Sequence, residues 1–299
     1  MSSATARLTW SLGDRPPDRL APGDGGSHEV VPDPWAWSHG AGVRVCVVDT
    51  GVEDGHRSIG RIQGAYEVVR DGTGELTVRE TDGGDACGHG TACAGLIRRV
   101  APECELYSVR VLGKGFTGTG AALLTGLRWA VEQGFPVVNL SLSTTRRQFL
   151  EALRSLADQA YFDRVTLVAS AHNSPVESYP WRFSSVISVG SHREDDPGLF
   201  LYNPDPPVEF FAPGQNVYVA WLNGTCIRTT GNSFATPFIS GLCARLLGSH
   251  PGLTPFQVKN ALYLAAANVR TAAAAAGEPA GEPVGESVGT SVGDADRGE

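Results

Sequence analysis

Apolar runs of strand length alternate with apolar stripes of helical spacing through the middle of this 299-residue chain. The runs are bounded by turn residues, as expected for strands buried on both faces, and they cover residues 43–48, 106–112, 136–142 and 165–171. Between them, residues 123–131 and 149–160 carry the apolar spacing of amphipathic helices. This order requires right-handed crossovers. We therefore predict a single α/β domain with a mostly parallel central sheet flanked by helices.

Composition changes sharply near both ends of the chain. Residues 1–27 are rich in Pro, Gly, Asp and Arg, and the segment 271–299 has a glycine at every fourth position from 277 to 293. Segments with so few apolar residues cannot bury enough surface to fold alone. We expect a flexible N-terminal arm (1–27), a folded domain (28–270) and a disordered acidic tail rich in Gly, Glu and Pro (271–299).

Charge and hydropathy exclude two classes of partner. The tail contains six acidic residues and one basic residue, so it holds −5 of the formal net charge of −8 and leaves the rest of the chain nearly neutral. A near-neutral domain has little electrostatic attraction for nucleic acid or an anionic membrane. No stretch reaches the roughly 18 apolar residues that span a bilayer. We expect neither nucleic acid nor a membrane as a partner.

The N-terminus and the cysteines indicate the compartment. The apolar cluster at residues 8–12 is shorter than the core of a secretory signal, so we predict a cytoplasmic protein with six free thiols. Export by another route would instead permit three disulfides. Cys87, His89 and Cys93 are close enough in sequence to suggest zinc, but no Cys-x-x-Cys pair accompanies them. Zinc is therefore the weaker interpretation.

Three short segments contain the residue types of nucleophilic catalysis. Asp49 follows the first buried run, His89 lies between two glycines at the start of a small-residue helix, and Ser233 opens a further helix. A serine hydroxyl needs an adjacent base to act as a nucleophile near neutral pH. An imidazole base in turn needs a carboxylate that fixes its tautomer. Each segment alone is weak evidence, because Asp-Thr-Gly is commonly a turn and Gly-His-Gly commonly a loop.

In the order Asp, His, Ser, these segments resemble those of the subtilisin-like serine peptidases, the subtilases. The resemblance runs from about residue 32 to about residue 267 and includes residues 101–102, 109–113, 137–142, 212–214 and 250–251. It implies a serine endopeptidase in which His89 is the general base, Asp49 orients the imidazole and Ser233 forms the acyl-enzyme. It also implies that Asn173 and the Ser233 N–H donate hydrogen bonds to the oxyanion.

The resemblance further implies a cleft that holds a peptide or protein substrate as an extended strand. The matching positions are Leu112, Gly113, Lys114, Ser141, Leu142, Ser143, Ser170 and His172. His172 and Ser143 stand where the family usually has glycine, so we predict a selective pocket for the residue that precedes the cleaved bond. Glu177 lies in a short connection near this pocket. It either accepts a basic substrate side chain or, as most surface glutamates do, stays solvated.

Two features of many subtilases are expected to be absent. Only residues 96–100 separate the His89 motif from Ala101, too few for the calcium loop that many relatives insert there, so no metal or other cofactor is predicted. About 30 residues precede the domain, fewer than an inhibitory prodomain needs. This leaves an enzyme that folds unaided or one whose arm covers the cleft. Cys93 matches the position of a thiol beneath the catalytic histidine in some subtilases.

Three functions are compatible with these residues. The leading prediction is a selective intracellular endopeptidase that processes a peptide, with leader removal from a natural-product precursor as one candidate task. A peptide ligase or macrocyclase would use the same triad, because water and an amine attack the same acyl-enzyme. A catalytically silent subtilase would instead capture extended peptides along the segment 112–118.

Overall fold

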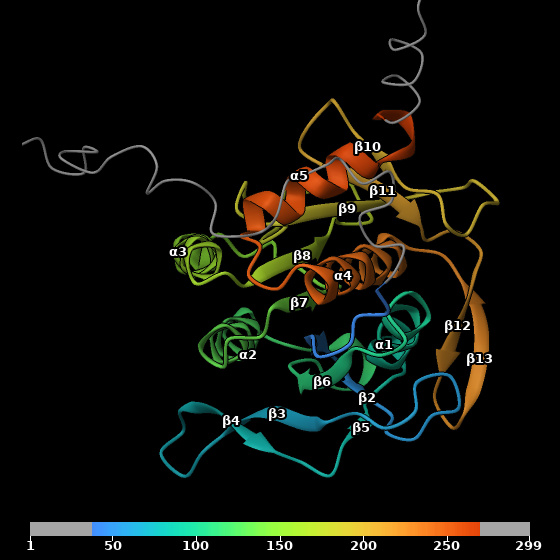
Figure 1. Cartoon of the computed structure of the whole chain (residues 1–299). Helices are drawn as coiled ribbons and strands as arrows, with labels where there is room; N and C mark the ends of the chain where they lie inside the picture. The colour runs from blue at the N-terminus through green and yellow to red at the C-terminus, as the bar shows by residue number, and fades with distance from the viewer. Residues whose placement is uncertain (1–37, 270–299) are drawn as a thin grey trace, which may run out of the picture.

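Nine strands form one sheet at the centre of the computed structural model, which describes residues 38–269 (Figure 1). The strand order is β10-β11-β9-β8-β7-β1-β6-β3-β4, and every neighbouring pair is parallel except β10–β11 and β3–β4 at the two edges. The strands are β1 (Arg44–Asp49), β3 (Gly64–Arg70), β4 (Leu76–Glu80), β6 (Glu105–Arg110), β7 (Val137–Leu140), β8 (Thr166–Ser170), β9 (Ile187–His192), β10 (Leu201–Tyr202) and β11 (Phe210–Pro213). The predicted α/β class is confirmed. The predicted arm and tail lie outside the described residues.

Helices cover both faces of the sheet (Figure 1). On one face lie α1 (His89–Val100), α4 (Asn232–Ser249) and α5 (Pro255–Ala265), and on the other α2 (Gly120–Glu132) and α3 (Leu150–Phe162). The apolar sequence of β1 is explained by the helices that cover it on both faces. Val45 and Val47 pack in the α1–α4–α5 core, whereas Cys46 and Val48 pack in the α2–α3 core, because successive side chains of a strand point to opposite faces.

Local sequence sets where several of these helices begin and end. Thr119 accepts a hydrogen bond from the backbone N–H of Ala122 at the start of α2. Thr254 and Gln257 form a reciprocal capping box ahead of α5, an arrangement that satisfies backbone N–H groups of the first turn. Gly134, with φ 63°, ends the α2 segment, since glycine adopts the left-handed conformation without steric cost.

Short elements connect the sheet to the helices that carry the predicted catalytic residues. Strand β2 (Gly51–Val52) pairs antiparallel with β5 (Gly84–Asp85), which ties the end of β1 to the segment before α1. The hairpin β12 (Val217–Trp221) and β13 (Thr225–Thr229) packs beside α1 (Figure 1). The 3-10 turns η2 (Lys114–Phe116) and η3 (Arg147–Phe149) precede α2 and α3. Within residues 38–269, no helix has the length and apolar character needed to cross a membrane.

Candidate active site

Asp49 and His89 meet at the carboxyl end of β1. Asp49 is the last residue of β1, fully buried, and His89 is the first residue of α1, with 8% of its surface exposed. The Nδ1 atom of His89 lies 2.8 Å from Oδ1 of Asp49, and that carboxylate oxygen also accepts a hydrogen bond from the Thr50 N–H at 2.8 Å. A carboxylate on Nδ1 holds the imidazole in the tautomer that leaves Nε2 as a base.

The glycines that flank His89 allow α1 to approach β1 and β12 closely. Gly88 has φ 94°, and a Cβ atom added to it would lie 2.7 Å from the Trp221 ring. A Cβ added to Gly90 would lie 2.0 Å from the carbonyl oxygen of Gly51. Any larger residue at either position would push the helix, and His89 with it, away from Asp49.

Ser233 is the second residue of α4 and lines the same cavity as His89. This cavity has a volume of about 560 Å³. The ring of Phe234, the next residue, lies 5.4 Å from the His89 ring. The Ser233 hydroxyl donates to the carbonyl oxygen of Ser141 at 3.2 Å, so its proton points away from His89 in this conformation. Catalytic hydrogen bonds in substrate-free enzymes are often formed only in the complex, and a rotation about one side-chain bond redirects this hydroxyl.

Asn173 lies at the same cavity with its amide oriented by the backbone. Its Oδ1 atom accepts a hydrogen bond from the Asn232 N–H at 3.0 Å, which leaves Nδ2 as a donor. The N–H of Ser233 belongs to the first turn of α4, where backbone donors have no partner within the helix. Asn173 Nδ2 and Ser233 N–H are therefore the two donors available to a developing oxyanion.

Burial and charge act in opposite directions on His89. Burial of the ring disfavours the protonated form, but the Asp49 carboxylate outweighs this effect and raises the pKa of His89 well above its ordinary value. Cys93 Sγ lies 4.0 Å from His89 Nδ1 and 3.9 Å from Asp49 Oδ2, beneath the pair. Burial raises the pKa of the Cys93 thiol, which keeps this sulfur protonated near neutral pH.

Asp85 supports the site and was missed by the sequence analysis. Its carboxylate accepts hydrogen bonds from the Cys87, Gly88 and Thr91 N–H groups at 3.0, 2.8 and 2.8 Å. It also accepts hydroxyl hydrogen bonds from Thr50 and Thr91, both at 2.6 Å. The Asp85 side chain thus connects Thr50, which follows Asp49, to the residues before and after His89. A single Asp in a polar loop carries no sequence signal for such a role.

The cavity includes six of the eight predicted substrate-binding residues and leaves out two. Its lining contains Leu112, Ser141, Leu142, Ser143, Ser170 and His172. Gly113 and Lys114 are not part of it, because the Gly113 N–H bonds to the Thr117 carbonyl at 2.7 Å and closes the segment into a tight turn. An isolated bridge joins Leu112 to Gly118 across this turn, and the cavity lining continues through Gly118, Thr119 and Gly120. Phe116 projects into the cavity lining in place of Lys114.

A hydrogen-bonded floor lies behind Ser143. The hydroxyl of Ser143 donates a hydrogen bond to Ser178 Oγ at 3.0 Å. Ser178 is fully buried and also accepts a hydrogen bond from Trp181 Nε1 at 2.8 Å. Glu177 does not reach the cavity. Its carboxylate faces Arg147 at 3.8 Å, with both side chains about half or more exposed, so the solvated interpretation of Glu177 is the one that the structure bears out.

The donor set does not suit a metal ion. Within the described residues, the one group of three potential ligand atoms within 4.8 Å is Asp49, His89 and Cys93, and Cys87 is not part of it. There His89 Nδ1 is already hydrogen-bonded to Asp49. Residues 101–104 join α1, which runs to Val100, to β6, which begins at Glu105.

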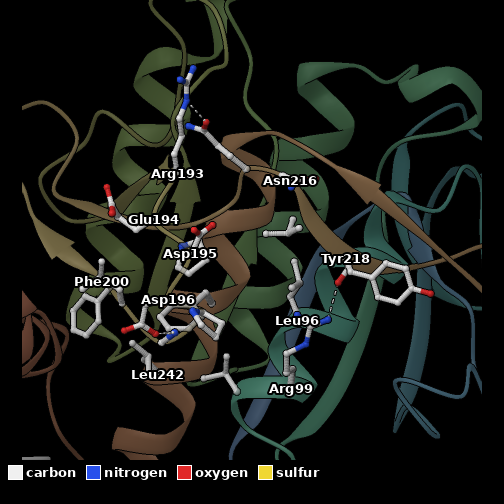
Figure 2. Close-up of a pocket in the computed structure, with 18 of the residues that line it drawn as sticks. Leu96, Arg99, Arg193, Glu194, Asp195, Asp196, Phe200, Asn216, Tyr218 and Leu242 are labelled. Atoms are coloured by element: carbon white, nitrogen blue, oxygen red, sulfur yellow. Dashed lines mark hydrogen bonds between the residues drawn. The ribbon is translucent and has the colours of Figure 1, made fainter.

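A second, larger cavity borders this site, and Thr230 lines both cavities. It has a volume of about 1120 Å³ and is bounded by α1, α4 and the loop that follows β9 (Figure 2). Its floor is apolar, with Leu96 and Leu242, and its rim is charged, with Arg99, Arg193 and Asp195. None of its lining residues is a serine, cysteine or histidine, so it holds no counterpart of the Asp49, His89 and Ser233 set.

Known proteins match both the sequence and the fold. The family model described as "Subtilase family" matches residues 40–284. This chain belongs to the subtilase family. Subtilisin DY of Bacillus licheniformis is 32% identical over 245 residues, covering 77% of this subtilase and 85% of the relative. Thermitase of Thermoactinomyces vulgaris is 29% identical over 230 residues, with 72% and 78% covered.

A solved structure gives the same result for the fold. The crystal structure of a cold adapted subtilisin-like serine proteinase superposes on this subtilase with a TM-score of 0.62 at 28% sequence identity. The superposition covers 79% of this chain and 88% of that protein. The subtilase is accordingly a serine protease of the hydrolase class.

Proposed function

We propose that this subtilase hydrolyses peptide bonds through an acyl-enzyme on Ser233. The observation that carries the proposal is the 2.8 Å contact between Asp49 and His89 at a cavity that Ser233 also lines. The Ser233 oxygen attacks the scissile carbonyl carbon while its proton passes to His89 Nε2. Asp49 holds the other imidazole nitrogen and stabilises the positive charge that forms on the ring.

The remaining steps use the same groups. Asn173 Nδ2 and the Ser233 N–H donate to the tetrahedral oxyanion. His89 then returns the proton to the leaving amine, which breaks the peptide bond and leaves the acyl-enzyme. A water molecule gives a proton to His89 Nε2 and attacks the ester carbonyl carbon, and His89 then returns that proton to Ser233 Oγ as the ester bond breaks and the acid product leaves.

We also propose that the enzyme is selective and acts in a reducing compartment. The bonds of Ser178 to Ser143 and Trp181 support selectivity, because they fix a polar floor behind the pocket wall. All six cysteines lie in the described residues and are free thiols, which supports a cytoplasmic site of action. A dedicated peptide substrate, such as a natural-product precursor, would be compatible with both features. An extended peptide or protein is the expected partner.

Labelling with a fluorophosphonate tests the catalytic role, because the reagent phosphonylates an activated serine and releases fluoride. The wild type should be labelled and should cleave peptides, and Ser233→Ala should do neither. Ser249→Ala, at the exposed end of the same helix, is the matched control. Loss of labelling in the control, or labelling that survives in Ser233→Ala, would contradict the proposal. Mass spectrometry of products formed with an added amine peptide separates hydrolysis from ligation.

A further inference from the structure

Phe116 occupies an unusual position for a large side chain. It lies at the end of the 3-10 turn η2 with φ 60°, and 51% of its surface is exposed. Residues other than glycine are uncommon in this left-handed region, because an L side chain there is sterically disfavoured. The turn is held by the Gly113 N–H on the Thr117 carbonyl and by the bridge between Leu112 and Gly118. The fold therefore maintains an exposed aromatic ring in a disfavoured conformation.

The ring of Phe116 lies against the predicted general base. Its centroid is 5.4 Å from that of His89, with the two planes at 84° in an edge-on contact. Phe234 contacts the same imidazole from α4, also at 5.4 Å. Only 8% of His89 is exposed, so a substrate group that approaches the imidazole from the cavity also meets the Phe116 ring.

The order of strands places Phe116 on one wall of the cavity. Leu112 follows β6, Ser141 follows β7 and Ala171 follows β8, and all three line the cavity. In the sheet, β6 and β8 are separated by β1 and β7, which is about 14 Å at the usual strand spacing. The wall after β6 carries Phe116, while the opposite wall after β8 carries Asn173.

An extended substrate presents alternate side chains to these two walls. The sequence resemblance predicts that the side chain of the residue before the cut enters the pocket after β7 and β8, where Ser143 and His172 line the cavity. The residue before that one points the opposite way, because side chains alternate along an extended chain. Its side chain then meets His89 and the exposed ring of Phe116.

We propose that Phe116 is a specificity-determining residue that selects an apolar side chain at the second residue before the cleaved bond. This rests on the function proposed above. Contact with the ring removes apolar surface from water, and about 50 Å² of such surface corresponds to about a five- to tenfold preference in kcat/KM. A carboxylate side chain at that position gains no such burial and loses part of its hydration.

Paired peptides that differ only at that second residue, leucine against glutamate, test the proposal in the full-length enzyme. In Phe116→Gly, a change that suits φ 60°, the leucine preference should fall about five- to tenfold. In Phe116→Leu, which keeps an apolar side chain, most of the preference should remain. Phe162→Ala is the matched control, because Phe162 is 80% exposed at the end of α3, away from the cavity lining. Its preference should equal that of the wild type.

Two results would overturn the proposal in distinguishable ways. If Phe116→Gly reacts with fluorophosphonate and cleaves both peptides with the wild-type preference, Phe116 does not set specificity, although the enzyme functions as proposed. An equal loss of preference in Phe162→Ala would also refute the assignment. If the wild type neither reacts with the fluorophosphonate nor cleaves any peptide, the proposed function itself is wrong and the Phe116 proposal falls with it.

Discussion

Replacing Asp85 should weaken the fold and the active site together. The carboxylate accepts five hydrogen bonds, from Thr50, Cys87, Gly88 and twice from Thr91. Asp85→Ala leaves three backbone N–H groups and two hydroxyls without their acceptor. Asp85→Asn keeps one acceptor oxygen, but its amide N–H₂ would face the Thr91 N–H, so this variant should be intermediate.

The magnitude follows from the number and charge of these bonds. Hydrogen bonds to an ionised acceptor contribute about 1.5–3 kcal/mol each, but Asp85 is only partly buried, and water replaces part of the loss. We expect about 3–4 kcal/mol of lost unfolding free energy in Asp85→Ala, the size seen when one partner of a buried charged pair is removed. For a domain of this size, that corresponds to a Tm decrease of about 6–16 °C.

Thermal unfolding and fluorophosphonate labelling, measured well below the Tm, give the two readouts. Asp71→Ala is the matched control, because the Asp71 carboxylate also accepts three hydrogen bonds, from Thr73 and Glu75, but lies exposed in the β3–β4 hairpin. That variant should change the Tm little and leave labelling intact. If Asp85→Ala is no less stable than Asp71→Ala and is labelled at the wild-type rate, the assigned network does not support His89.

Four further predictions concern the chemistry of the site and its thiols. Because only neutral His89 acts as a base, its raised pKa should place the acid limb of the kcat/KM profile above pH 6.5. Asp49→Asn removes the carboxylate that raises this pKa, so the residual activity of that variant should show the acid limb at lower pH. Asn173→Ala should lower kcat about 100- to 1000-fold, a range established on a subtilisin, with KM little changed. Slight burial raises the pKa of the Cys226 thiol, but hydrogen bonds with Arg57 and Ser58 outweigh this effect and lower it. Iodoacetamide should therefore modify Cys226 before the buried thiols, and Arg57→Gln should slow that reaction. Chelators should leave the Tm nearly unchanged, and a fall of many degrees would contradict the predicted lack of a metal.

The amino-acid sequence was sufficient for the parallel sheet and for the predicted triad. The run at residues 43–48 is apolar on both faces, which only a central strand covered by helices requires, and Asp49 follows it directly. The roles of His89 and Ser233 were predicted from the order of the three segments and its resemblance to the subtilases, because each segment alone is weak evidence. Local propensity and hydrophobic pattern predict the strands and helices, since both act between neighbours in the chain.

Tertiary contacts alone decided the shape of the cleft and its support. Lys114 and Phe116 are two residues apart, and only the turn closed by Gly113 and Thr117 determines that the ring, rather than the ammonium group, joins the cavity. The hydrogen bond from Thr50 to Asp85 and the one from Ser143 to Ser178 each join segments 35 residues apart in the chain. Hydrogen bonds and ring contacts depend on atomic positions within a few tenths of an ångström, which no periodicity encodes, so these parts required the folded structure.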